Sequence, residues 1–320
     1  EYTQIDDNTV DGVIFSKSNL VCNGTGSLTI EADYKHGIVS KDDLVITGGT
    51  YKIAAADNGI TAKDQIKILN GSFDIDAANS AVKAKNTDDA ELGNIYIAGG
   101  IFTIEAEQDG FHATGSIVVD DGTITVNSGD DGFHAELDTV IHGGTILVEK
   151  SNEGLEGKRV VVNGGDITVN ASDDGANAAG SGDDDSNAAS SNNDSSAAVN
   201  SGDDSSISGA ADGKEPPQMP PDTENGSDMQ PSQDFDPENA PSGGNAPQNF
   251  DPGNAPSDGD APQKMQGGPG GGGNSELYIK ITGGTLTVSA DGDGLDSNGG
   301  LLVTGGTTIV YGPTSDGDSA

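Results

Sequence analysis

Apolar and polar residues alternate in short stretches along most of this chain, and the same arrangement returns about every 22 residues. Leu44 and Ile46 precede a Gly-Gly turn, and Tyr51 and Ile53 follow it, with polar residues between them. A third short stretch follows an acidic phrase, as in the Phe-His-Ala sequence at 133–135. Alternation with a period of two is typical of β-strands with one buried face. Three strands per repeat, joined at glycine corners, predict an all-β parallel β-helix of about nine coils, right-handed as parallel crossovers usually are.

The repeat is interrupted once. Residues 1–180 carry seven coils, and residues 275–320 carry the final coils, which stop where another acidic corner begins (316–318) and so predict a truncated last coil. Residues 181–274 lose the alternation, become rich in Ser, Asp and Asn and then in Pro and Gly, and hold 12 of the 13 prolines. Such a composition cannot bury enough apolar surface to offset the entropy lost on ordering. We therefore expect a disordered insertion that leaves the β-helix at one turn and returns to it in phase.

Composition narrows the range of functions. The formal net charge of −39 excludes binding to the phosphates of nucleic acid and suits the binding of cations. The chain has 49 glycines and no Trp, which a β-helix tolerates because each coil buries only a thin slice of core. The single cysteine, Cys22, excludes an internal disulfide and is expected to be a buried thiol. No stretch is apolar enough to predict insertion into a membrane.

Carboxylates recur at one corner of the predicted coils. When the coils are aligned on the glycine of the acidic phrase, the residue before this glycine is acidic in five consecutive coils. Stacking would place these carboxylates about 4.8 Å apart, where two unit charges repel by about 3.5 kcal/mol at an effective dielectric constant of about 20. Calcium takes about six to eight oxygen ligands and would bridge neighbouring carboxylates, whereas the alternative is that these residues only form turns. The expected calcium ligands are Asp109, Asp130, Asp131, Glu153, Asp173, Asp174, Asp291 and Asp293.

A second polar strip is predicted beside this corner, on the outward face of the strand that follows it. Its histidines recur 22 residues apart and should stack on neighbouring coils, either to bind a ligand or merely to cap a solvent-exposed face. The strip suits a polymer that bears hydroxyl and carboxylate groups. Because Trp is absent and Tyr51 is predicted to face inward, binding would use cations and hydrogen bonds rather than ring stacking. The expected carbohydrate-binding residues are His112, His134, Glu156, Asn177 and Asp296.

The repeated Gly-Gly-Thr turns and the acid-Gly-Phe-His-Ala phrases at 109–113 and 131–135 resemble a known family. Its members are calcium-binding, pectate-lyase-like β-helix domains with a carbohydrate-binding role, found in secreted or surface proteins of cellulolytic bacteria. The stretches 291–297 and 311–317 are similar in character. The resemblance implies an extracellular location, several bound Ca2+ ions, and affinity for acidic plant polysaccharide such as polygalacturonate (pectin), with cellulose as a second ligand. Residues 79–82 depart from the acidic pattern, so no ion is expected there.

Three functions remain open at this point. The first is a non-catalytic, calcium-dependent binding domain for acidic polysaccharide, which would be a monomeric part of a larger surface protein. The second is a calcium-dependent pectate lyase acting by β-elimination, for which Lys150, Lys158 and Arg159 are the candidate bases. Nearby carboxylates would raise the pKa of a lysine rather than lower it, so we expect no enzyme activity. The third is a structural surface stalk that calcium only stiffens.

Overall fold

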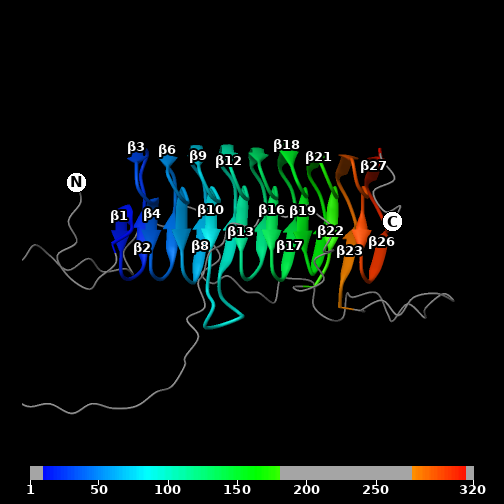
Figure 1. The fold of residues 1–320 in the computed structure, drawn as a ribbon, viewed down its shortest axis with the longest axis horizontal. Helices are drawn as coiled ribbons and strands as arrows, with labels where there is room; N and C mark the ends of the chain where they lie inside the picture. Colours follow the sequence, from blue (N-terminus) through cyan, green and yellow to red (C-terminus); the bar gives the residue numbers. More distant parts are fainter. Residues whose placement is uncertain (1–9, 181–275, 315–320) are drawn as a thin grey trace, which may run out of the picture. The chain divides into compact units, whose positions relative to one another are not determined.

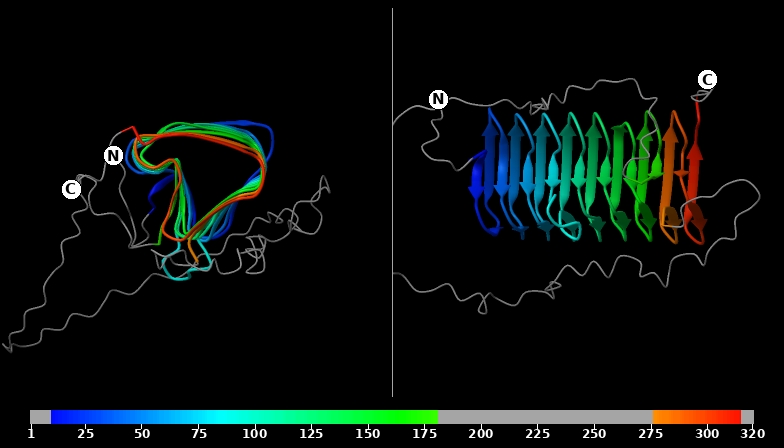
Figure 2. Two further views of the ribbon diagram at one scale, coloured as in Figure 1. Left: turned by 90° about the vertical axis from the view of Figure 1, so that its right-hand side faces the viewer. Right: turned by 60° about the horizontal axis from the view of Figure 1, so that its bottom comes forward.

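The computed structural model describes residues 10–180 and 276–314, whose regular secondary structure consists of β-strands. Three parallel sheets contain nine strands each, and every coil contributes one strand to each sheet (Figure 1). Viewed along the stack, successive coils superimpose on a three-sided outline (Figure 2). The predicted parallel β-helix of about nine coils is therefore confirmed, while its right-handed sense stays a prediction. In these residues no helix is long and apolar enough to cross a membrane.

The three sheets are termed A, B and C in the order in which each coil visits them. Sheet A consists of β1 (Gly12–Ser16), β4 (His36–Ser40), β7 (Ile60–Ala62), β10 (Val82–Ala84), β13 (Phe111–Ala113), β16 (Phe133–Ala135), β19 (Leu155–Gly157), β22 (Ala176–Ala178) and β25 (Asp296–Ser297). Sheet B consists of β2 (Leu20–Cys22), β5 (Leu44–Ile46), β8 (Gln65–Ile68), β11 (Asn94–Ile97), β14 (Ile117–Val119), β17 (Asp138–Ile141), β20 (Arg159–Val162), β23 (Tyr278–Ile281) and β26 (Gly300–Val303). Sheet C consists of β3 (Ser27–Ala32), β6 (Thr50–Ala55), β9 (Ser72–Ala77), β12 (Ile101–Ala106), β15 (Thr123–Ser128), β18 (Thr145–Ser151), β21 (Asp166–Ala171), β24 (Thr285–Ala290) and β27 (Thr307–Tyr311).

Burial follows the predicted alternation. In β9, Phe73 and Ile75 are fully buried, whereas Asp74 between them is exposed. Interior rings stack from coil to coil, with centroids 4.9 Å apart for Tyr51 and Phe73 and 4.7 Å apart for Phe73 and Phe102. Because parallel pairing in register places equivalent residues one strand spacing apart, the core consists of ladders of similar side chains.

The Gly-Gly turns require glycine for reasons of backbone geometry. At the corner between sheets B and C, the glycine at the second position of the turn has a positive φ, 110° at Gly49 and 139° at Gly71. Residues with a Cβ atom rarely adopt this conformation. The same conformation recurs at Gly100, Gly122, Gly144, Gly165, Gly284 and Gly306.

Two coils depart from the regular repeat. In the fourth coil a loop over 85–93 protrudes between β10 and β11 (Figure 1), so the corner residues Ser80 and Asp109 lie 29 rather than 22 residues apart. The eighth coil is split in the sequence, because β22 precedes and β23 follows the segment expected to be inserted. Sheet pairing nevertheless continues from coil seven to coil eight, where Val160 lies opposite Ile279.

Some expectations fall outside the described residues, and others change at the ends of the stack. The expected disordered insertion at 181–274 and the acidic corner at 316–318 lie outside the part of the chain that the structure describes. In the ninth coil, Leu301 and Val303 occupy the apolar positions that Leu44 and Ile46 occupy before their Gly-Gly turn, but they are 46% and 50% exposed because no described coil covers them. Cys22 in the first coil packs against the core but is only partly buried, because no described coil precedes it.

Candidate functional site

Five acidic residues stack at the corner where sheet C leads into sheet A. At this corner the glycine N–H of one coil donates to the carbonyl oxygen of the acidic residue in the next, as from Gly110 to Asp131 (2.8 Å) and from Gly132 to Glu153 (2.9 Å). The coils therefore have the register that the sequence alignment predicted. We term the five residues the acidic column: Asp109, Asp131, Glu153, Asp174 and Asp293.

The glycine that follows each column residue is explained by packing. A Cβ atom on Gly132 would lie 2.6 Å from the carbonyl oxygen of Gly154 and 3.0 Å from Cγ2 of Val148. Gly110 is similarly confined, because a Cβ atom on it would lie 2.7 Å from the carbonyl oxygen of Gly132 in the next coil. The close approach of neighbouring coils thus accounts for the glycine of the acidic phrase, and the carboxylate before it needs a separate explanation.

Column side chains also accept backbone hydrogen bonds. Asp131 Oδ1 accepts from the N–H of Glu153 at 3.2 Å, and Asp174 Oδ1 accepts from the N–H of Asp293 at 2.7 Å. Asn58, which occupies the equivalent corner in an earlier coil, accepts from the N–H of Ser80 at 3.2 Å. Because a neutral amide performs the same role, the turn-forming alternative explains the oxygen atom but not the negative charge.

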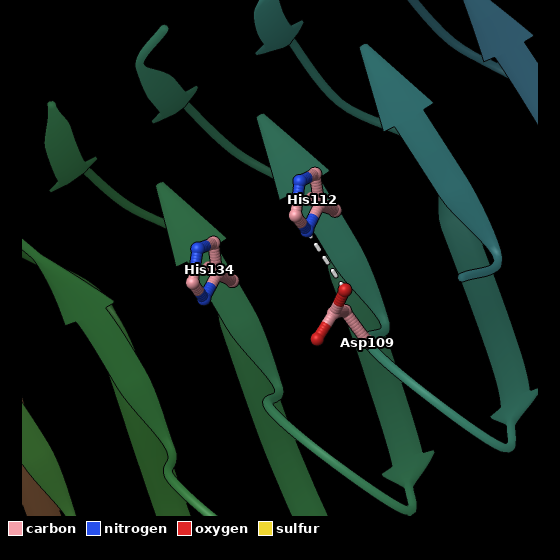
Figure 3. A group of neighbouring side chains, drawn as sticks. All are labelled: Asp109, His112 and His134. Atoms are coloured by element: carbon pink, nitrogen blue, oxygen red, sulfur yellow. Dashed lines mark hydrogen bonds and ion pairs between the residues drawn. The ribbon is translucent and has the colours of Figure 1, made fainter. Parts of the chain in front are cut away.

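Two histidines lie beside the N-terminal end of the column. His112 on β13 and His134 on β16 pair directly, and their rings are 4.8 Å apart and within 1° of parallel. His112 Nδ1 lies 2.8 Å from Asp109 Oδ2 (Figure 3), and His134 Nδ1 lies 3.0 Å from Asp131 Oδ2. His134 Nδ1 also contacts a carboxylate oxygen of Glu156 on β19. We term this group the histidine cluster: Asp109, His112, Asp131, His134 and Glu156.

The two histidines have opposite electrostatic surroundings. Burial lowers the pKa of His112, and its hydrogen bond to Asp109 only partly offsets this. Burial also disfavours a charged His134, but hydrogen bonds to Asp131 and Glu156 and the charges of both outweigh it and raise the pKa of His134. Burial raises the pKa of Asp131, helped by Glu156 and opposed by His134. For Asp109, burial would raise the pKa, but the hydrogen bond from His112 contributes to a net lowering.

Further along the column, two buried oxygen atoms have no hydrogen-bond partner among the described residues. Asn177 Nδ2 donates to Glu153 Oε1 at 3.1 Å, but Glu153 Oε2 and Asn177 Oδ1 receive no hydrogen bond. Burial, together with the charges of Asp131 and Glu156, raises the pKa of Glu153 to about 9. Buried acceptors without a donor are rare, and a bound cation is one partner that can satisfy such an oxygen.

Another pair of carboxylate oxygens converges one coil later. A Cβ atom on Gly292 would lie 2.7 Å from Asp173 Oδ1 and 2.8 Å from Asp174 Oδ1, so both oxygens border the space that this glycine leaves. Burial and the charge of Asp173 raise the pKa of Asp174 to about 6, although a backbone hydrogen bond from Asp293 opposes the shift. These donors are all oxygen atoms, which is the ligand type that calcium prefers. Glu153, Asn177, Asp173 and Asp174 therefore fit calcium by their chemistry.

Earlier in the stack, the protein supplies its own counter-charge. Lys35 Nζ lies 2.9 Å from Asp57 Oδ2, and Asn79 Nδ2 donates to Asp57 Oδ1 at 3.0 Å. Ser80 Oγ donates to Asp109 Oδ2 at 3.0 Å. Residues 79–82, where no ion was expected, thus contribute neutral donors to the carboxylates of neighbouring coils. Elsewhere in the described residues, lysine and arginine form ion pairs at Lys41–Asp11, Lys52–Asp74, Lys63–Asp88 and Arg159–Asp138.

The remaining expected calcium ligands divide between the two ends of the column. Oxygen atoms of Asp130, Asp109 and Asp131 all lie within 4.8 Å of one another, so Asp130 adjoins the histidine cluster. Asp293 ends the column. Asp291 accepts a hydrogen bond from Thr314 Oγ1 at 2.6 Å and lies next to the last described segment. The structure therefore distributes the expected ligands over several corners rather than gathering them at one ion.

The predicted outward strip is continuous on sheet A. His134 lies opposite Glu156, Glu156 lies opposite Asn177, and Asn177 lies opposite Asp296. With His112 at its N-terminal end, the strip runs along the coil axis directly beside the acidic column. The five residues expected to contact carbohydrate thus form a single row, although their role stays a prediction.

The candidate bases for a lyase lie in different surroundings. Arg159 binds the buried Asp138 through two hydrogen bonds, one of them 2.5 Å from Nη2 to Oδ2, and so has a structural partner. Lys83 was not among the candidate bases, although it precedes His112 in the outward row of sheet A. Burial lowers the pKa of Lys83 despite the opposing charge of Asp109. The repeat pattern places Lys83 on the outward row beside the site. No feature of the sequence, however, indicates that this long side chain is partly buried there.

Two of the described tyrosines are exposed, but they leave the expectation about ring stacking unchanged. Tyr51 is buried, as predicted, but Tyr34 is 78% exposed and Tyr311 is 61% exposed. Tyr34 follows β3 in the first coil and Tyr311 ends β27 in the last, so the two rings cannot form a joint stacking platform.

A β-helix with a polar, charge-rich row beside one corner belongs to the class of solenoid domains, whose stacked repeats form long continuous surfaces. A family model described as carbohydrate-binding domain-containing protein matches residues 1–212, more than half of the 320 residues. The chain therefore belongs to this family of carbohydrate-binding domain proteins. No curated protein and no solved structure matches it.

Proposed function

We propose that this chain is a non-catalytic, calcium-dependent binding domain for acidic polysaccharide of the polygalacturonate (pectin) type, with cellulose as a second ligand. In this proposal the domain is a monomeric, extracellular part of a larger surface protein. Family membership supports carbohydrate binding, and the acidic column supports the requirement for a cation.

The observation that carries the calcium requirement is the pair of unsatisfied oxygens on Glu153 and Asn177. They lie on neighbouring coils, next to Asp173 and Asp174, whose oxygens converge at Gly292. When bound there, calcium would neutralise the column and offer coordination positions to a further carboxylate. Glu153 and Asp174 would hold the ion, and the amide of Asn177 would orient Glu153 through its existing hydrogen bond.

The charge of the chain explains why the ligand would need a cation. A protein of net charge −39 repels a polyuronate, so direct contact between the two is unfavourable without bridging ions. The row His134–Glu156–Asn177–Asp296 runs along the coil axis beside the column and offers hydrogen-bonding groups at every coil. A polymer lying along this row would contact similar hydrogen-bonding groups that recur at intervals of one strand spacing.

Affinity electrophoresis tests the proposal. The protein should be retarded in gels that contain polygalacturonate and calcium, and it should migrate freely when chelator replaces calcium. Glu153→Gln should weaken the retardation, while Asp76→Asn, which alters an exposed carboxylate on sheet C, should not. If no polymer retards the protein and calcium only raises its melting temperature, the domain is a calcium-stiffened stalk and the binding proposal is wrong.

A calcium-dependent lyase is the second candidate, because the lowered pKa of Lys83 meets one requirement for a base. The lyase would form an unsaturated uronate, which absorbs in the ultraviolet. Wild-type protein incubated with polygalacturonate and calcium should show no such absorbance if the domain only binds. Product formation that disappears in Lys83→Met, with binding retained, would instead establish the lyase.

A further inference from the structure

We propose that His134, Asp131 and Glu156 form a binding site for a transition-metal ion of the Zn2+ type, distinct from the oxygen-only positions assigned to calcium. The inference does not rest on carbohydrate binding. It rests on the kinds of donor atoms present and on their separation.

The three side chains converge from two adjacent strands and the corner before them. A nitrogen of His134 and carboxylate oxygens of Asp131 and Glu156 all lie within 4.8 Å of one another. Nδ1 of His134 is 3.0 Å from Asp131 Oδ2 and also contacts Glu156. Donor atoms bound to one tetrahedral metal ion are separated by only slightly more than this, so small side-chain adjustments would admit an ion.

The imidazole decides which metal would bind. Calcium takes oxygen ligands almost exclusively, whereas one imidazole with two carboxylates is a donor set that zinc and neighbouring transition metals accept. Only the N-terminal end of the column has an imidazole nitrogen beside it. In later coils, Glu156, Asn177 and Asp296 take the positions of His112 and His134. The calcium expectation for Asp131 therefore fits its surroundings less well than the same expectation for Glu153 and Asp174.

Features around the three residues are also those of a metal site. The side chains of His134 and Glu156 are 23% and 21% exposed, so a fourth ligand from solvent can reach the ion. Nε2 of His134 lies 3.8 Å from Glu136 Oε1, which is longer than a hydrogen bond, so a small side-chain movement would be needed for this carboxylate to orient the ring through its second nitrogen. His112 and Asp109 form the adjacent pair, and nitrogens of both histidines lie within 4.8 Å of an oxygen of Asp109.

The competing explanation is that His134 is simply a protonated imidazole paired with two carboxylates. In that arrangement the proton fills the position that the metal would take, and no metal binding results. A direct binding measurement therefore separates the two explanations, since proton and metal compete for the same nitrogen.

The test is a titration of chelator-treated protein with Zn2+, followed by calorimetry in the presence of millimolar Ca2+. We expect saturable binding that excess Ca2+ does not reverse. Co2+ in place of Zn2+ should give the visible absorption of a tetrahedral ion with nitrogen and oxygen ligands. His134→Gln should weaken Zn2+ binding by more than about 100-fold, Glu156→Gln should weaken it less, and His142→Gln, a histidine on another face, should leave it unchanged.

Circular dichroism spectra establish that each variant is folded. Because Glu156→Gln retains the imidazole and Asp131, it keeps the proposal testable if His134→Gln does not fold. Absence of Zn2+ binding, full displacement of Zn2+ by Ca2+, or equal Zn2+ affinity in wild type and both cluster variants would each overturn the proposal. None of these outcomes would affect retardation by polygalacturonate in calcium, which tests the proposed function separately.

Discussion

The imidazole rings of His112 and His134 are stacked 4.8 Å apart, yet the residues around them favour opposite charge states. His112 is half-buried and contacts a single carboxylate, whereas His134 contacts two. Two adjacent imidazolium ions would repel each other, so a neutral and a charged ring form the more stable pair. This asymmetry arises because the outward row changes from histidine to glutamate one coil after His134.

In metal-free protein, we predict that His112 is neutral at pH 7 while His134 remains protonated above pH 8. Nitrogen–proton correlation spectra of the imidazole rings would report both charge states directly. Glu156→Gln should lower the pKa of His134, because it removes one of the two carboxylates that stabilise the imidazolium. Titration of both rings near the ordinary histidine pKa would show that the cluster does not have this electrostatic asymmetry.

The pKa of Glu153 predicts how stability depends on pH without calcium. A carboxyl group with a raised pKa in the folded state binds its proton more tightly there than in the unfolded chain. Its stabilising contribution is therefore complete below the unfolded pKa of about 4.3 and is lost as the pH rises toward about 9. In chelator, the melting temperature should fall across this range, and Asp174 should add to the fall up to a pH of about 6.

Calcium should oppose this fall because it binds the ionised carboxylates. The increase in melting temperature on adding calcium should thus grow between pH 5 and pH 9. Glu153→Gln should reduce both the pH dependence in chelator and the increase with calcium, which isolates this residue from the histidines. An equal calcium effect in wild type and Glu153→Gln would place the ion elsewhere.

The glycines of the acidic phrases should be intolerant of even a methyl group. Gly132→Ala would bring a Cβ atom to 2.6 Å from the carbonyl oxygen of Gly154, and we expect overpacking to destabilise the protein by about 1–3 kcal/mol. Gly26→Ala is the matched control, because no atom lies within 4 Å of its added Cβ. Urea denaturation measures both variants. Equal stability of Gly132→Ala and wild type would mean that the coils are spaced more widely than in this structure.

Much of this architecture could be predicted from the sequence because the same pattern of residues recurs in each coil of a solenoid. The alternation around Phe73 and the fixed period together determine the strands, the buried faces and the stacking of like residues. The acidic column was aligned correctly because Gly132 and its equivalents mark the same corner in each coil.

What the sequence could not provide was the environment of individual side chains at that corner. Repetition shows that Asp131 and Glu153 are equivalent in register, but not that one contacts an imidazole while the other has an unsatisfied oxygen. The burial of Lys83 depends on the neighbouring side chains of the outward row, and the partner of Arg159 depends on the packing of sheet B. Apart from the contact of Asp131 with His134, which lies within one coil, these contacts join residues about one coil apart, and small differences between coils decide them.

Arg159, at the start of β20 in sheet B, provides a test of whether a candidate base has a structural or a functional role. Asp138 is 2% exposed, and Arg159 binds it through Nε and Nη2, so Arg159→Met would leave a buried carboxylate without its partner. Because Arg159 itself is partly exposed, we expect a loss of about 2 kcal/mol or more rather than the full cost of breaking a wholly buried pair. Adding Asp138→Asn should restore part of the loss, since no buried charge then remains. Retardation by polygalacturonate in calcium should persist in Arg159→Met at temperatures where the protein is folded. If folded Arg159→Met loses this retardation and the double variant does not regain it, the guanidinium acts on the ligand, and its pairing with Asp138 serves to position it.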